Sequence, residues 1–138
     1  MHTYIQLSGQ WLDPTGKLLA TGYSGLGLAK NEPSYEMVPD TGPIPQGVYH
    51  IEAPINSPTH GPFAMPLEAD EGKEMFGRSG FMIHGDSLEH PGAASEGCII
   101  LGRPFREAIW ASGDHQLQVI SGVGNNYEAV HRAVNEED

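Results

Sequence analysis

Glycine and proline recur along the whole chain, and they limit its fold more than any other feature. The 138 residues include 18 Gly and 11 Pro. Proline fixes one backbone dihedral angle and removes an amide donor, while glycine favours turns, so long helices are disfavoured. Their combined share stays below the ~25–30% that is typical of low-complexity chains. The sequence therefore predicts an ordered, mainly β fold in which short strands alternate with many turns.

Apolar segments between these turns predict the strands. A hairpin is expected over residues 4–23, because Asp13-Pro14-Thr15-Gly16 has the composition of a tight turn. Residues 25–45 carry four prolines and are expected to form a long ordered loop. Further strands are predicted over 47–55, 63–67, 81–84, 98–101 and 115–121.

A single helix is expected over residues 103–110. Pro104 suits the first turn of a helix, where no amide donor is needed. Phe105, Ala108 and Ile109 follow at the spacing of one apolar face, which should pack onto the strands.

Length favours a single domain, residues 1–138. A chain of this size buries roughly two-thirds of the surface of its unfolded form, which is enough for a core without disulfides. We expect the core at about 42–121, with the 4–23 hairpin before it and a polar tail, 122–138, after it. Part of this tail, 127–134, is expected to be weakly helical.

The net charge argues against two classes of partner. Seven Lys and Arg residues stand against 18 Asp and Glu, which gives −11. Such a chain repels phosphate backbones and anionic lipid, so neither nucleic-acid binding nor membrane insertion is expected. The N-terminal residues lack the basic and apolar segments of an export signal, and no apolar run is long enough to span a membrane. We therefore expect synthesis in the cytoplasm without a signal peptide.

One cysteine stands in a setting that suits a nucleophile. Cys98 follows Ser95-Glu96-Gly97 at a predicted junction of loop and strand. Gly97 allows close approach of a substrate, and the N–H groups of Gly97 and Cys98 are candidate donors to a developing oxyanion. His84 ends another predicted strand, and the loop between them can bring the two side chains together.

A histidine beside this thiol would serve acyl transfer in three ways. It would lower the pKa of the Cys98 thiol by favouring a thiolate–imidazolium pair, accept the proton during attack, and protonate the leaving amine. The carbonyl of Gly85 or the carboxylate of Asp86 is expected to orient the imidazole of His84. A lone cysteine is by default an inert buried residue, so this interpretation depends on whether the two side chains meet.

Two segments carry the same order of residues as a known catalytic signature. They are Phe81-Met82-Ile83-His84-Gly85-Asp86 and Ser95-Glu96-Gly97-Cys98-Ile99-Ile100-Leu101. The pattern resembles L,D-transpeptidases of the YkuD type, which have a histidine, a loop and then Ser-His-Gly-Cys. Thr41-Gly42-Pro43-Ile44-Pro45-Gln46-Gly47-Val48-Tyr49 is similar to the strand entry of those domains, and the resemblance covers roughly 42–121. It implies a β-sandwich or barrel with one or two short helices packed on it.

Two residues depart from that signature. Glu96 replaces the histidine that usually precedes Gly-Cys, and Ile100 replaces an arginine that usually follows Cys-Ile. The Ser-x-Gly-Cys form and the His-Gly-Asp string instead resemble the type VI secretion L,D-transpeptidase effectors, the Tlde family. Because a carboxylate aimed at the sulfur would raise the pKa of the Cys98 thiol, we expect the Glu96 side chain to turn outward.

The resemblance implies acyl transfer on the stem peptides of peptidoglycan. Cys98 would attack the carbonyl before the terminal D-Ala of a tetrapeptide, with His84 as base and then acid, and D-Ala would leave. Water would release a tripeptide, which is an L,D-carboxypeptidase reaction, or a free D-amino acid would give exchange. No metal or other cofactor is implied. A cognate immunity protein, secretion apparatus components as partners and action in the periplasm of a target cell are also implied.

Four further residues are candidates for substrate contact. Arg78 or Arg103 would replace the missing guanidinium and bind a stem-peptide carboxylate. Ser95 is expected to shape the loop or contact substrate, and His90 to line the cleft. The other histidines show no metal-ligand spacing and are interpreted as surface or local hydrogen-bonding residues. They are His2, His50, His60, His115 and His131.

Two alternatives stay open from the sequence. The chain could be a catalytically inactive module that binds wall peptides or a partner protein, with Glu96 and Ile100 as marks of lost activity. It could also be a cytosolic hydrolase of small D-amino-acid peptides that uses the same Cys98 and His84. Rapid reaction of the thiol with iodoacetamide, lost in His84→Ala, would favour an enzyme over the binding module.

Overall fold

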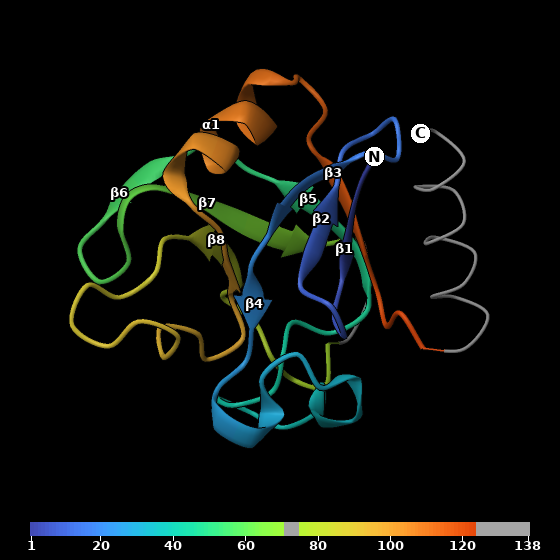
Figure 1. Ribbon diagram of the computed structural model, residues 1–138, viewed down its shortest axis with the longest axis vertical. Coiled ribbons are helices and arrows are strands. Elements are labelled where there is room, and N and C mark those ends of the chain that lie inside the picture. Colours follow the sequence, from blue (N-terminus) through green and yellow to red (C-terminus); the bar gives the residue numbers. More distant parts are fainter. Residues whose placement is uncertain (71–74, 124–138) are drawn as a thin grey trace.

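The computed structural model describes residues 1–70 and 75–123, and its architecture is mainly β, which confirms the predicted class. Within these ranges ten strands form one mixed sheet, accompanied by one helix and two 3-10 turns (Figure 1). The strands are β1 (His2–Ile5), β2 (Gln10–Leu12), β3 (Leu18–Thr21), β4 (Tyr23–Ser24), β5 (Gly47–Ile51), β6 (Ile55–Ser57), β7 (Gly61–Ala69), β8 (Met82–His84), β9 (Ile99–Ile100) and β10 (Gln116–Ile120). The helix is α1 (Arg103–Ala111), and the turns are η1 (Gly27–Ala29) and η2 (Pro33–Tyr35).

The sheet runs in the order β3-β2-β1-β10-β5-β7-β8-β9-β4, and β6 pairs with the first half of β7. The pairs β1–β10 and β8–β9 are parallel, and the other neighbours are antiparallel. The N-terminal hairpin predicted over 4–23 therefore continues the same sheet through β10. Parallel strands need a long connection, which residues 85–98 provide between β8 and β9.

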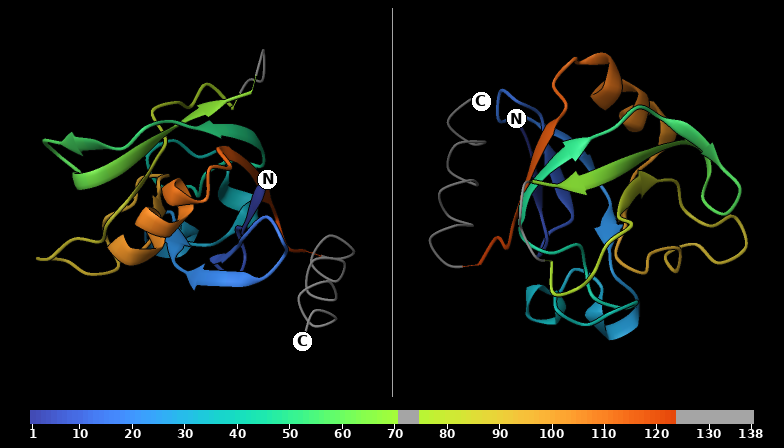
Figure 2. Two further views of the ribbon diagram at one scale, coloured as in Figure 1. Left: turned by 90° about the horizontal axis from the view of Figure 1, so that it is seen from above. Right: turned by 180° about the vertical axis from the view of Figure 1, so that it is seen from behind.

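The β6–β7 hairpin differs from the sequence prediction. Strands were predicted over 47–55 and 63–67, whereas β5 ends at Ile51, β6 spans Ile55–Ser57 and β7 already begins at Gly61. Pro62 is tolerated there because β6 and the start of β7 form an outer hairpin, where fewer ladder bonds need an amide donor. Both views of Figure 2 show this hairpin and the 85–98 connection extending on the same side of the molecule.

Helix α1 packs against β7 and β8 (Figure 1), but not with the predicted face. Phe105 is 41% exposed and Ala108 is also exposed, whereas Arg106 and Ile109 are buried. The predicted inward face is therefore wrong for Phe105 and Ala108 and confirmed for Ile109, because the helix turns Arg106 inward in their place. The core beside it is formed by buried residues of most strands, among them Ile83, Ile99 and Leu117.

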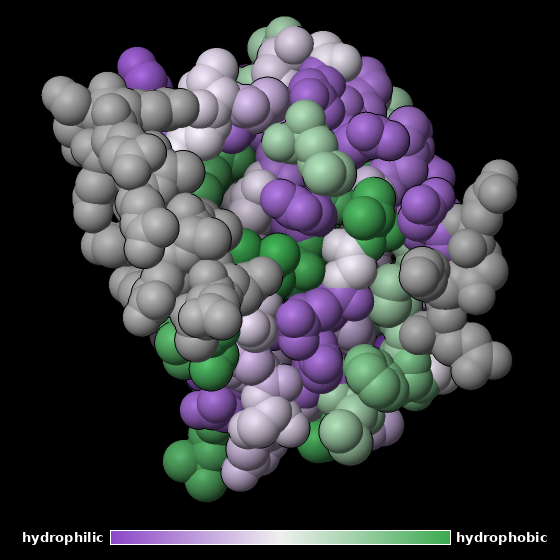
Figure 3. Space-filling view, turned by 90° about the vertical axis from the view of Figure 1, so that its right-hand side faces the viewer, coloured by the Kyte–Doolittle hydropathy of each residue, from purple (hydrophilic) through white to green (hydrophobic). Residues whose placement is uncertain are grey.

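The side of the molecule away from the β6–β7 hairpin shows hydrophobic residues in small groups between hydrophilic ones (Figure 3). None of the helices in residues 1–70 and 75–123 has the length and apolar character that crossing a bilayer requires. The helical segment predicted over 127–134 lies outside the described residues.

Candidate active site

His84 ends strand β8, and Cys98 directly precedes β9, the neighbouring parallel strand. In the register of β8 and β9, Ile83 pairs with Ile99 and His84 pairs with Ile100. Both Ile83 and Ile99 point into the core with no exposed surface. Since successive side chains alternate between the faces of a sheet, Cys98, one residue before Ile99, lies on the same face as His84.

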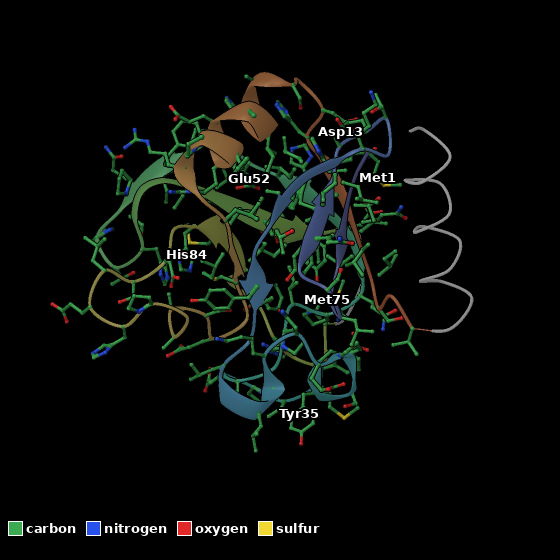
Figure 4. All side chains as sticks on the ribbon, in the orientation of Figure 1. Met1, Asp13, Tyr35, Glu52, Met75 and His84 are labelled. Atoms are coloured by element: carbon green, nitrogen blue, oxygen red, sulfur yellow. The ribbon has the colours of Figure 1, made fainter. Side chains whose placement is uncertain are left out.

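Their separation follows from strand geometry. Neighbouring strands lie about 4.8 Å apart and two residues span about 6.6 Å, so the Cα atoms of His84 and Cys98 are on the order of 8 Å apart. Both side chains line one cavity of about 890 Å³. Figure 4 places His84 at the end of β8, on the side where the β6–β7 hairpin lies. The fold therefore directs both side chains into the same cavity.

The imidazole of His84 is oriented by its own neighbour. Nδ1 lies 2.8 Å from the carbonyl oxygen of Gly85. Because a carbonyl can only accept, Nδ1 carries the proton and Nε2 carries the lone pair. Nε2 is buried without a hydrogen-bond partner among the described residues. His84 therefore presents an unoccupied basic nitrogen.

The surroundings of His84 favour its neutral form. Burial lowers the pKa of this imidazole, the hydrogen bond with the Gly85 carbonyl opposes this, and the interactions with His60 and Arg106 lower the pKa further. The ring of His60 stacks on that of His84, with centroids 4.3 Å apart and an angle of 25° between the planes. His60, at the tip of the β6–β7 hairpin, was interpreted as a surface or local hydrogen-bonding residue, but it lines the cavity.

The thiol of Cys98 is also held in its neutral form. The residue is 8% exposed, and burial raises its pKa to about 11, although a backbone hydrogen bond from Met82 and the charge of Arg78 oppose this. The side chain of Glu96 is exposed, as expected, and its charge adds to the increase. Burial of both groups therefore opposes the predicted thiolate–imidazolium pair.

Ser95 organises the loop before Cys98. Its side chain has no exposed surface, and its Oγ donates to the carbonyl of Cys98 (2.6 Å). The same Oγ accepts from the N–H groups of Gly25 (2.9 Å) and Gly97 (3.1 Å). Of the two predicted roles, shaping the loop agrees with this geometry and substrate contact does not. Since Gly97 already donates to Ser95, the predicted oxyanion donor at Gly97 is engaged, and Cys98 N–H is the remaining candidate.

Arg78 joins three loops rather than offering a free guanidinium. Nη1 donates to the carbonyls of Glu36 (2.6 Å) and Pro43 (2.8 Å), and Nη2 donates to those of Gly42 (2.9 Å) and Glu96 (3.2 Å). The predicted contact with a substrate carboxylate is not supported, because backbone oxygens occupy both terminal nitrogens. Gly97 has φ 136°, and a side chain there would collide with Nη2 of Arg78. Arg78 thus fixes the backbone that carries Cys98.

The other predicted contacts divide between the cavity and the outer surface. Asp86 does not touch the imidazole; its carboxylate accepts from Tyr23 Oη (2.6 Å) and from the N–H groups of Ser87 and Gly92, which holds the 85–98 connection together. His90 lines the cavity. Arg103 is exposed, pairs with Glu107 at 3.9 Å and does not line the cavity, so its position does not support the predicted contact with a substrate carboxylate.

Arg106 is the arginine that sequence analysis missed. It lies on the inward face of α1, is 5% exposed and lines the cavity near His84. No motif marks it, since helical spacing pointed to Phe105 as the inward residue. In residues 1–70 and 75–123 no group of three or more His, Cys, Asp or Glu side chains could hold a metal ion.

The family of the chain follows from comparison with known proteins. The model of the Tlde1 domain matches residues 19–123, about three quarters of the sequence. The chain belongs to the Tlde1 domain family. This is the type VI secretion L,D-transpeptidase effector family that the motifs around His84 and Cys98 resemble. No curated protein and no solved structure matches the chain.

Membership in the Tlde1 domain family implies an L,D-transpeptidase-type enzyme with peptidoglycan as its substrate class. It also implies a secreted effector. The matched range includes His84, Cys98 and the cavity residues of α1.

Proposed function

We propose that this Tlde1 family member is an L,D-carboxypeptidase or L,D-transpeptidase that acts on tetrapeptide stems through Cys98 and His84. One observation carries the proposal. Nε2 of His84 is buried without a hydrogen-bond partner among the described residues, Nδ1 is held by the Gly85 carbonyl, and His84 and Cys98 line the same cavity. A buried basic nitrogen without a partner is costly, and it is retained where a proton has to be accepted.

The first half of the reaction would start from a neutral thiol and a neutral imidazole. As the sulfur attacks the carbonyl before the terminal D-Ala, the thiol proton passes to Nε2 of His84. The Gly85 carbonyl stabilises the imidazolium through Nδ1, and the N–H of Cys98 is the candidate donor to the oxyanion. His84 then protonates the nitrogen of D-Ala, the C–N bond breaks, and a thioester remains on Cys98.

The second half would release the acyl group. Water attacks the thioester with His84 as base and leaves a tripeptide, or the amine of a free D-amino acid attacks and gives an exchanged tetrapeptide. We further propose that the protein acts in the periplasm of a target cell after export by a secretion apparatus. A cognate immunity protein that covers the cavity would protect the producing cell.

A catalytically inactive binding module is the second candidate. The raised pKa of Cys98 and its small exposed surface favour this alternative, because a buried, protonated thiol is a poor nucleophile unless a base deprotonates it. The two candidates share the fold and the cavity. They differ in whether a bond of the stem peptide is broken.

Mass spectrometry of disaccharide tetrapeptide after incubation with the protein decides between them. We expect the wild type to remove one D-Ala, and Cys98→Ser and His84→Gln to remove none above background. His50→Gln is the matched control, because His50 is exposed on β5 and does not line the cavity. Cleavage at another bond of the stem, or an intact peptide with every variant, would contradict the proposal.

A further inference from the structure

Two of the three nitrogens in the Arg106 guanidinium, Nε and Nη1, donate hydrogen bonds to backbone carbonyls. Nε donates to the carbonyl of Leu101 (3.0 Å), and Nη1 donates to the carbonyls of Pro62 and Phe63 (2.9 Å each). These bonds attach α1 to the start of β7. Nη2 has no acceptor among the described residues, although the side chain is only 5% exposed and lines the cavity. Three N–H groups of the planar guanidinium are therefore held by backbone carbonyls. The remaining nitrogen, Nη2, is left for a partner in the cavity.

No carboxylate of the described residues lies within ion-pair distance of this guanidinium, and Glu107 acts on its charge only from farther away. In the part of the chain that the structure describes, ion pairs join only the N-terminal amine with Asp114 and Arg103 with Glu107. All three acceptors of Arg106 are backbone carbonyls, which carry no net charge. A buried cation without a counter-ion is unfavourable, so an anion that reaches Nη2 would gain a strong, charge-assisted hydrogen bond.

The free nitrogen lies beside the catalytic imidazole. A Cβ built on Gly85 would lie 2.9 Å from Nη2, so this nitrogen lies close to the backbone that holds Nδ1 of His84. His60 stacks on the His84 ring and also lines the cavity. We call the part of the cavity formed by His60, His84, Gly85 and Arg106 the cationic arm. Three acidic residues also line the cavity, Asp40, Asp86 and Glu96, and the carboxylate of Asp86 accepts from Tyr23 Oη and from the N–H groups of Ser87 and Gly92.

We propose that Nη2 of Arg106 binds the α-carboxylate of the leaving D-amino acid, so that the cationic arm selects peptides with a free C-terminal carboxylate. The proposal rests on the proposed function of Cys98 and His84. To protonate the leaving nitrogen, Nε2 of His84 must approach it to about 3 Å. In an α-amino acid the carboxylate is bonded to the carbon next to that nitrogen, so it must lie within a few ångströms of the imidazole. Arg106 is the guanidinium at this position.

The cationic arm would also select which amine accepts the acyl group in the exchange reaction. When a free D-amino acid attacks the thioester, a C–N bond forms, the C–S bond breaks, and the amine proton passes through His84 to the sulfur. The incoming amine occupies the place of the amine that left, so its α-carboxylate meets Nη2 of Arg106. Amino acid amides and simple amines lack this carboxylate and should be poor acceptors.

Binding of two peptides to the Cys98→Ala protein tests the proposal without turnover. The probes are a tetrapeptide that ends in D-alanine and the same peptide that ends in D-alaninamide, measured by calorimetry. We expect the carboxylate form to bind at least about ten-fold more tightly, the effect of one charge-assisted hydrogen bond. In Cys98→Ala with Arg106→Gln the ratio should fall to within about two-fold, and with Arg106→Lys it should be intermediate.

Arg103→Gln, on the same helix but outside the cavity, removes the same charge and should leave the ratio unchanged. If Arg106→Gln fails to fold because three carbonyls lose their donor, the Cys98→Ala ratio and the Arg106→Lys variant still decide. Equal binding of both peptides to Cys98→Ala, or an undiminished preference in the Arg106→Gln or Arg106→Lys variant, would overturn the proposal. Failure of the proposed function is a separate result, because it would appear as wild type that releases no D-Ala from a peptide it binds.

Discussion

The ionisation of the Cys98 thiol gives a quantitative prediction. Its pKa of about 11, against an ordinary value of 9.0, means that the thiolate share at neutral pH is about 100-fold lower than for a free thiol. A thiolate of higher pKa is intrinsically more nucleophilic, and a Brønsted slope of about 0.4–0.5 restores roughly an eight-fold factor. We therefore expect iodoacetamide to alkylate Cys98 about ten-fold more slowly than a free thiol at pH 7. The 8% exposure of the residue should slow the reaction further.

The assay is the alkylation rate from pH 6 to 10, followed by intact-protein mass spectrometry, with N-acetylcysteine amide as the reference. The rate for Cys98 should rise through the whole range without a plateau. His84→Gln should change the rate at pH 7 by less than about two-fold, because no ion pair is lost. Alkylation of the resting thiol therefore does not separate the enzyme from the binding module, as the sequence alone suggested it would; release of D-Ala does. A rate that is faster than the reference and constant between pH 6 and 8 would refute the reasoning, since it requires a thiolate–imidazolium pair in the resting protein.

Three further predictions concern the residues around this thiol. The pKa of His84 is lowered below 6.5, so its neutral form persists as the pH falls through 6.5. The acid limb of the pH profile of kcat/KM should therefore lie below pH 6.5, and a midpoint at or above 6.5 would contradict this. His60→Ala removes the ring that stacks on His84 and an interaction that lowers the pKa of His84. The acid limb of the kcat/KM profile should therefore move to higher pH, and an unchanged limb would show that His60 has no such effect. Arg78→Met removes four hydrogen bonds to backbone carbonyls. It should lower the free energy of unfolding, measured by urea titration, by about 2–4 kcal/mol. A change below about 0.5 kcal/mol would refute the role of Arg78 in joining the loops.

The class of the fold, and the presence of His84 and Cys98 in one cavity, could be predicted from local sequence. Short apolar runs between glycines and prolines predict strands, and β8, β9 and β10 lie within the predicted ranges. The positions of His84 and Cys98 followed from their motifs. Strand alternation and the β8–β9 register are enough to put both side chains on one face.

What the sequence did not predict depends on contacts between distant segments. Arg106 faces inward because carbonyls of Leu101, Pro62 and Phe63 accept its donors, and no spacing along the helix reports those partners. His60 reaches His84 from a hairpin more than twenty residues earlier in the chain.

The motif also did not predict the protonation states of Cys98 and His84. The Cys-His pattern suggests an ion pair, but the preferred state is set by burial of both groups, which is a property of the packed fold. The predicted roles of Arg78 and Ser95 changed for a similar reason, since backbone groups of neighbouring loops occupy their polar atoms.

The central claim, that Cys98 carries the acyl group, is tested most directly by acid quenching of the wild type during turnover of disaccharide tetrapeptide. Intact-protein and peptide mass spectrometry should then find a disaccharide tripeptide as a thioester on Cys98, which hydroxylamine removes. An adduct on another residue, or release of D-Ala at the wild-type rate by Cys98→Ala, would contradict it.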